Sequence, residues 1–172
     1  MSYKGDYLSF ELADFLFGIS TQEVLELNKN LHLTPVPKST SHLRGITNLR
    51  GQIVPVIDMY ERLKLGDHPN KNESISVILR CTGIVIALLV DNIGQILPLD
   101  EDSFEPPPNN FSPVLKELII GVHKLPDRLL HILDGQKIIG GLKATRELPF
   151  NKEIIKGIDI HRNLQINGPA RP

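Results

Sequence analysis

The chain has 172 residues, enough for one compact domain or for two small units that share a core. It carries 19 Lys and Arg against 20 Asp and Glu and has no Trp, so it lacks the basic excess and the stacking surfaces of a nucleic-acid binder. Cys81 is the single cysteine, which excludes an internal disulfide framework. The N-terminal residues do not predict a signal peptide, and the longest apolar stretch, Ile84 to Val90, is too short to cross a bilayer. We therefore expect a soluble cytoplasmic protein with no membrane insertion.

Strand signals dominate the chain from its start. Leu8, Phe10 and Leu12 alternate with polar residues, the period of a half-buried strand, and the chain turns back at 13–14. The same reasoning, applied in chain order, predicts strands at 15–19, 24–27, 46–49, 52–57, 75–81, 84–90, 93–97, 119–122 and 128–133.

Helices are predicted to be few and short. Asp58 can cap a helix that runs through Leu65, and Asp134 can cap a final helical turn near Ile138. The proline-rich segments 33–37 and 106–108 are expected to be irregular, because proline lacks a backbone donor and restricts the residue before it. A polar stretch, 67–74, is predicted to be a surface loop.

The second half of the chain repeats the first. Leu8, Phe10 and Val24 recur as Val77, Leu79 and Ile93 at an offset of 69 positions, and the segment 45–58 recurs as 121–134 at an offset of 76. Chance could produce some of these matches, but the glycines and capping aspartates recur with the apolar positions. The repeat predicts two similar units of about five strands, 7–65 and 75–139, each curled into a small barrel.

One segment is not repeated. Thr47-Asn-Leu-Arg-Gly51 corresponds to His123-Lys-Leu-Pro-Asp127 in the second half. A feature present in one copy is not explained by what both copies need for folding, so Arg50 is the leading functional candidate.

No catalytic constellation is apparent. The six histidines lack metal-ligand spacing, and the strand residue His131 is expected to be a buried or edge histidine. Cys81 is expected to be a small apolar filler. Asp58 and Asp91 could be imagined as a catalytic carboxylate pair, but each follows an apolar strand, where aspartate usually caps the next element. We expect neither catalysis nor a cofactor nor a metal; a small β-barrel enzyme would need a convergent set of polar groups in a pocket.

The motifs together resemble the CheW-like domain family. They are the run Gly45-Ile-Thr-Asn-Leu-Arg-Gly-Gln-Ile-Val-Pro-Val-Ile-Asp58, preceded by Val24-Leu-Glu-Leu27 and followed by Leu88-Leu-Val-Asp91, Ile120-Gly-Val122 and Ile132-Leu-Asp134. The resemblance covers residues 7–139. It implies an all-β fold of two five-stranded SH3-like barrels in pseudo-twofold arrangement, with short helices.

The resemblance also implies a function. Members are non-enzymatic adaptors that couple methyl-accepting chemotaxis receptors to the histidine kinase CheA. One face of the first subdomain binds the regulatory domain of CheA, and a groove near the subdomain boundary receives the receptor's cytoplasmic tip. The partner-binding positions that it implies here are Arg50, Asn48, Gly45, Gly51, Val24 and Glu26.

Three questions stay open at this level. Arg50 could reach a partner, or it could pair internally with Glu26 and only fix its loop. A related scaffold for a CheA-like kinase in another pathway, such as surface motility, would carry the same domain. Residues 140–172 extend beyond the matched domain with no assigned role; Gly140-Gly141 is expected to stop the last helix.

Overall fold

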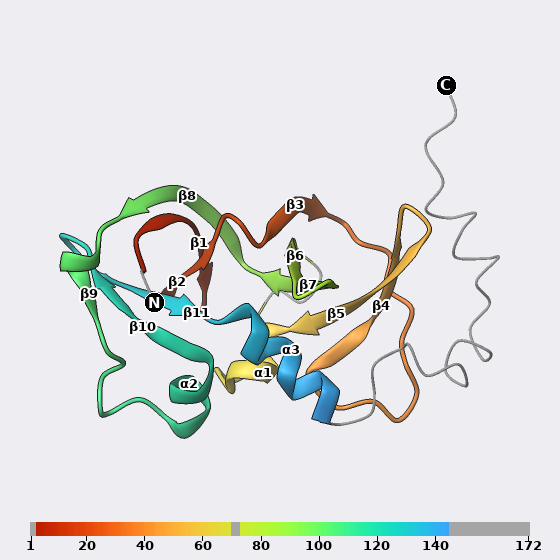
Figure 1. Cartoon of the computed structure of the whole chain (residues 1–172). Helices are drawn as coiled ribbons and strands as arrows, with labels where there is room; N and C mark the ends of the chain where they lie inside the picture. Colours follow the sequence, from red (N-terminus) through yellow and green to blue (C-terminus); the bar gives the residue numbers. More distant parts are fainter. Residues whose placement is uncertain (1–2, 70–72, 145–172) are drawn as a thin grey trace.

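The structure is a computed structural model, and it describes residues 3–69 and 73–144 (Figure 1). Strands make up most of it, joined by three short helices and a 3-10 turn. The strands are β1 (Gly5–Leu12), β2 (Phe15–Ser20), β3 (Val24–Lys29), β4 (Leu43–Leu49), β5 (Gln52–Asp58), β6 (Ile75–Cys81), β7 (Ile84–Val90), β8 (Asn92–Leu99), β9 (Phe104–Glu105), β10 (Ile119–Lys124) and β11 (Leu129–Leu133). The helices are α1 (Met59–Leu63), α2 (Pro113–Leu118) and α3 (Gly135–Ala144).

The strands form two sheets that lie side by side, with α1 and α3 near the middle of the molecule (Figure 1). One sheet has the order β8-β1-β2-β11-β10-β9, and the other has the order β3-β6-β7-β5-β4. All pairs are antiparallel except β2 with β11 and β5 with β7. The predicted all-β class with two small barrels is confirmed.

The internal repeat is visible in the pairing. Val56 pairs with Ala87 in one parallel pair, and Ile132 pairs with Gly18 in the other, which are the same two positions after the offsets of 76 and 69. The bulge between Leu43 and Gly45 in β4 likewise recurs between Ile119 and Gly121 in β10. Each element of one sheet therefore has a counterpart in the other, apart from the two-residue strand β9.

The predicted boundaries of the two subdomains, 7–65 and 75–139, need correction. β1 and β2 pair with strands of the second half, while β6 and β7 pair with strands of the first half. The five-stranded sheet thus takes three strands from the first repeat and two from the second, and the six-stranded sheet takes two from the first and four, including the short β9, from the second. Equivalent strands of the two repeats carry the same apolar pattern. The sequence therefore shows which strands correspond, but it does not show which of the two barrels each strand joins.

The buried apolar residues that the structure describes form three clusters. The largest lies between the sheets and combines residues of both, among them Phe10, Phe17, Ile57 and Leu79. Two smaller clusters occupy corresponding places, one in each sheet. The shared core joins the two barrels into one packed unit.

The helices show where the sequence predictions held and where they did not. Asp58 caps α1, since its Oδ1 accepts from the Tyr60 and Glu61 amides, but the helix ends at Leu63 rather than Leu65. Helix α2 was missed, although Ser112 followed by Pro113 is a helix start.

Helix α3 does not stop at Gly140 and continues to Ala144. Burial of Ile138 and Ile139 in the shared core offsets the cost of about 1 kcal/mol that a glycine adds inside a helix.

Candidate functional site

The hairpin between β4 and β5 ends in a tight turn that presents Arg50. Arg50 and Gly51 both have a positive φ, 52° and 82°, the combination of a two-residue turn whose twist matches the flanking strands. The Asn48 Oδ1 accepts a hydrogen bond from the Gly51 amide at 2.8 Å and closes the turn. Asn48 and Gly51 therefore fix the conformation from which the Arg50 side chain extends.

Arg50 contacts the neighbouring edge strand. Its Nη1 lies 2.7 Å from the Glu26 Oε2 on β3, so the internal pair anticipated from the sequence exists. The Arg50 side chain is nevertheless 79% exposed, against 21% for Glu26. A planar guanidinium has five N–H donors, and this exposure leaves donors available to a partner.

A surface cavity of about 340 Å³ lies beside this pair, lined by Glu26, Asn28, Asn30, Leu31, His32, Thr47, Asn48, Leu49 and Arg50. Among the described residues, no group hydrogen-bonds the buried Thr47 hydroxyl. Leu25 and Leu27, which flank Glu26 on β3, are each 46% exposed. We call Glu26, Asn48 and Arg50, with the cavity that they line, the Arg50 surface.

The remaining predicted site residues lie behind this surface. Val24 is half-buried and packs on the shared core. Gly45 is buried at φ 154°, and a Cβ there would lie 2.6 Å from the Thr34 carbonyl oxygen. The structure thus brings Glu26, Asn48, Arg50 and Gly51 together, whereas Val24 and Gly45 support the strands beneath them.

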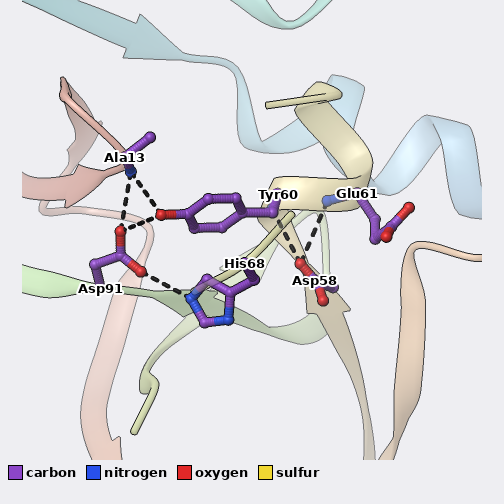
Figure 2. Close-up of polar contacts among 6 residues, drawn as sticks. All are labelled: Ala13, Asp58, Tyr60, Glu61, His68 and Asp91. Carbon is purple, nitrogen blue, oxygen red and sulfur yellow. Dashed lines mark hydrogen bonds and ion pairs between the residues drawn. The ribbon is translucent and has the colours of Figure 1, made fainter. Parts of the chain in front are cut away.

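A polar cluster that the sequence reasoning missed is centred on Asp91, at the crossover from β7 to β8 (Figure 2). Its Oδ2 accepts from the Tyr60 hydroxyl at 2.6 Å and from the Ala13 amide at 2.9 Å. Its Oδ1 lies 2.8 Å from the His68 Nε2, and the His68 ring packs on the Tyr60 ring. One carboxylate therefore ties together the β1–β2 turn, helix α1 and the connection between the repeats.

The predicted capping role of Asp91 was wrong, while that of Asp58 was right. Both carboxylates bond to Tyr60, one to its amide and one to its hydroxyl, so each has a structural partner (Figure 2). Burial and the hydrogen bond to Asp91 raise the pKa of Tyr60 to about 12, which keeps its hydroxyl a donor. Local sequence gives no sign of this cluster, because its members are far apart in the chain.

The other singled-out residues are buried. Cys81 is 3% exposed, as expected of an apolar filler, and burial raises the pKa of its thiol to about 12. His131 lies among the rings of Phe15, Phe17 and Phe111, and burial lowers its pKa. Within residues 3–69 and 73–144, no three His, Cys, Asp or Glu side chains gather as a metal site would require. No helix in these ranges is long and apolar enough to span a membrane.

Comparison with known proteins places the chain in a family. The model of the CheW-like domain matches residues 6–143. The chemotaxis protein CheW of Thermotoga maritima is 29% identical over 134 residues, covering 78% of this chain and 87% of that protein. Protein FrzA of Myxococcus xanthus is 32% identical over 62 residues, 36% of this chain and 39% of that protein. The crystal structure of the scaffolding protein TtCheW from Thermoanaerobacter tengcongensis has a TM-score of 0.69 and 31% identity, covering 76% of this chain and 89% of that one. With its repeat, its paired sheets and its Asn-Leu-Arg-Gly turn, this chain belongs to the CheW-like domain family of chemotaxis coupling adaptors.

Proposed function

We propose that this chain acts in the cytoplasm as a coupling adaptor without catalytic activity of its own. It links the cytoplasmic tip of methyl-accepting chemotaxis receptors to the regulatory domain of the histidine kinase CheA. The main support for a binding site is the exposed Arg50 guanidinium, which extends from a rigid hairpin tip next to Glu26.

The exposure of Arg50 argues against a purely structural role. An exposed ion pair stabilises a fold by about 0–1 kcal/mol, so the pair with Glu26 adds little to folding. Arginine is enriched among the residues that dominate binding energy, because its planar fork bonds carboxylates and carbonyls with defined geometry. The turn holds the backbone of Arg50 in place, which lowers the entropy lost on binding.

The surroundings also suit a protein partner. The exposed Leu25 and Leu27 offer apolar contact on the same edge strand, and the Arg50 surface provides polar contacts next to them. Apolar anchors beside an arginine are the usual composition of a binding surface. We assign this surface to the receptor tip.

A charge-swap experiment tests the assignment. Arg50→Glu and Glu26→Arg, separately and together, are assayed for thermal stability and for binding to a receptor cytoplasmic fragment by calorimetry. If Arg50 contacts the receptor, the double swap restores stability but leaves binding weakened by about tenfold or more. If the pair only holds the turn, the double swap restores both, and the Arg50 surface is not the receptor site.

A second pathway has one observation in its favour. Over 62 residues, 36% of its length, the chain is 32% identical to protein FrzA of Myxococcus xanthus. A scaffold for a CheA-like kinase in another pathway would use the same surface and differ only in its partners. Pull-downs with each CheA-class kinase and receptor of the host separate the two pathways.

A further inference from the structure

Equivalent places in the two sheets differ in polarity beside the Arg50 surface. Asn28 on β3 pairs with Ser76. The offset of 69 positions relates this pair to Leu97 and Tyr7, which pair between β8 and β1. Leu97 packs on the apolar cluster of its sheet, whereas Asn28 lines the cavity of the Arg50 surface. Because the fold accepts a leucine at this place, folding alone does not account for the carboxamide of Asn28.

A second equivalent pair differs in its hydrogen bonds. Thr47 and His123 occupy the same place, since each pairs with the equivalent residue of the next strand at the offset of 76. The His123 Nδ1 lies 2.7 Å from the Ser103 Oγ, while its Nε2 has no partner in the described part of the chain. Thr47 is 3% exposed, and no described residue bonds its hydroxyl, which is its only polar side-chain atom.

The cavity wall therefore holds hydrogen-bonding groups that the described chain leaves unused. The half-buried Asn28 side chain has no hydrogen bond to any described residue, and Asn48 uses only its Oδ1, to close the turn. A buried hydroxyl without a partner destabilises the fold, and a group that enters the cavity and bonds it removes that penalty. Rotation of Thr47 about its Cα–Cβ bond would turn the hydroxyl toward such a group.

The charges around the cavity favour a neutral occupant. The Arg50 guanidinium and the Glu26 carboxylate are the two formally charged groups in the lining, and they neutralise each other at 2.7 Å. Inside the cavity a carboxylate would meet Glu26, and an ammonium group would meet Arg50. The remaining polar groups are carboxamides, a hydroxyl and an exposed imidazole, which both donate and accept hydrogen bonds. A carboxamide is the side-chain group that complements them.

We propose that the receptor segment bound at the Arg50 surface inserts an asparagine or glutamine side chain into this cavity. Its carboxamide bonds the Thr47 hydroxyl and the Asn28 side chain, while the backbone of the same segment lies along Arg50. The inference rests on the proposed function, because it takes the segment that contacts Arg50 as the source of the carboxamide.

Two variants remove the unused groups without removing Arg50. Thr47→Val replaces the hydroxyl by a methyl group of similar size, and Asn28→Leu installs the residue of the equivalent place. Each is expected to keep or raise the melting temperature, and to weaken binding of a receptor cytoplasmic fragment by about fivefold or more in calorimetry. Gln136→Leu, at an exposed position on α3, is the control and should bind as the native chain does. A clear fall in the melting temperature of Thr47→Val would show that its hydroxyl is bonded in the free chain, and the proposal would be overturned.

An alanine scan of the receptor fragment identifies the inserted residue. Replacing one Asn or Gln of the fragment should weaken binding to the native chain by about fivefold or more and have no further effect on binding to Thr47→Val. Coupling of Thr47 to a charged residue of the fragment, or to none, would overturn the proposal. Weakened binding by Arg50→Ala alone, with native binding by Thr47→Val and Asn28→Leu, would overturn it too while leaving the proposed function in place. Native binding by all three variants would contradict both.

Discussion

Asp91→Asn should destabilise the protein far more than an ordinary change at a partly exposed aspartate. The carboxylate accepts three hydrogen bonds, from Tyr60, Ala13 and His68, and an asparagine offers one accepting oxygen in place of two. Each hydrogen bond to a charged group contributes about 1.5–3 kcal/mol. We expect Asp91→Asn to lower the unfolding free energy by about 2 kcal/mol, which corresponds to the loss of one such bond. The value lies toward the low end of the range because the Asp91 side chain is 22% exposed.

Urea unfolding followed by circular dichroism measures this loss, since the chain has no Trp for fluorescence. A loss of about 2 kcal/mol corresponds to a fall in Tm of roughly 4–8 °C for a chain of this size. Tyr60→Phe should cost about 1.5 kcal/mol, and the double variant should lose about 1 kcal/mol less than the sum, because the two residues share one bond. Asp14→Asn, at an exposed position on the same turn as Ala13, is the matched control. A change within about 0.5 kcal/mol for Asp91→Asn, or strict additivity with Tyr60→Phe, would refute the reasoning.

Three further predictions follow from buried groups. Burial lowers the pKa of His131, so as the pH drops below about 6.5 the unfolded chain takes up a proton that the folded chain does not. The free energy of unfolding should therefore fall in this pH range, and its dependence on pH should be shallower in His131→Gln. The Cys81 thiol, with its pKa raised to about 12, should resist a thiol reagent in the native chain and react once urea unfolds it; fast native labelling would contradict its burial. Gly45→Ala should cost more than about 1 kcal/mol, because its Cβ would meet the Thr34 carbonyl at φ 154°, and a melting temperature equal to that of the native chain would disprove this.

Much of the fold follows from local pattern. The strands Ile75–Cys81 and Ile84–Val90 have the predicted bounds, because β-branched runs on each side of Thr82-Gly83 are typical of a β-hairpin. The capping by Asp58 was likewise predictable, since aspartate after a strand and before a helical run is a local signal.

Local sequence pattern does not determine which of the two sheets each strand joins. Val56 and Ile132 are equivalent positions of the two repeats. The sequence around them therefore does not predict that β5 pairs with β7 while β11 pairs with β2. The same limit hid the bond between Tyr60 and Asp91, which depends on how the two repeats exchange strands. For the site, the unrepeated Asn-Leu-Arg-Gly turn pointed to Arg50, but only the three-dimensional structure shows that the Arg50 side chain is exposed while it contacts Glu26.

We propose that this chain couples receptors to a kinase through Arg50. Reconstituted complexes of receptor fragment, CheA and this chain allow kinase activity to be measured with native protein and with Arg50→Ala. Arg50→Ala is expected to keep the native melting temperature within a few degrees, since the lost pair is exposed, and to weaken assembly by about thirtyfold, or about 2 kcal/mol. Native kinase activation by Arg50→Ala, or a loss of activation that only tracks unfolding, would contradict the account.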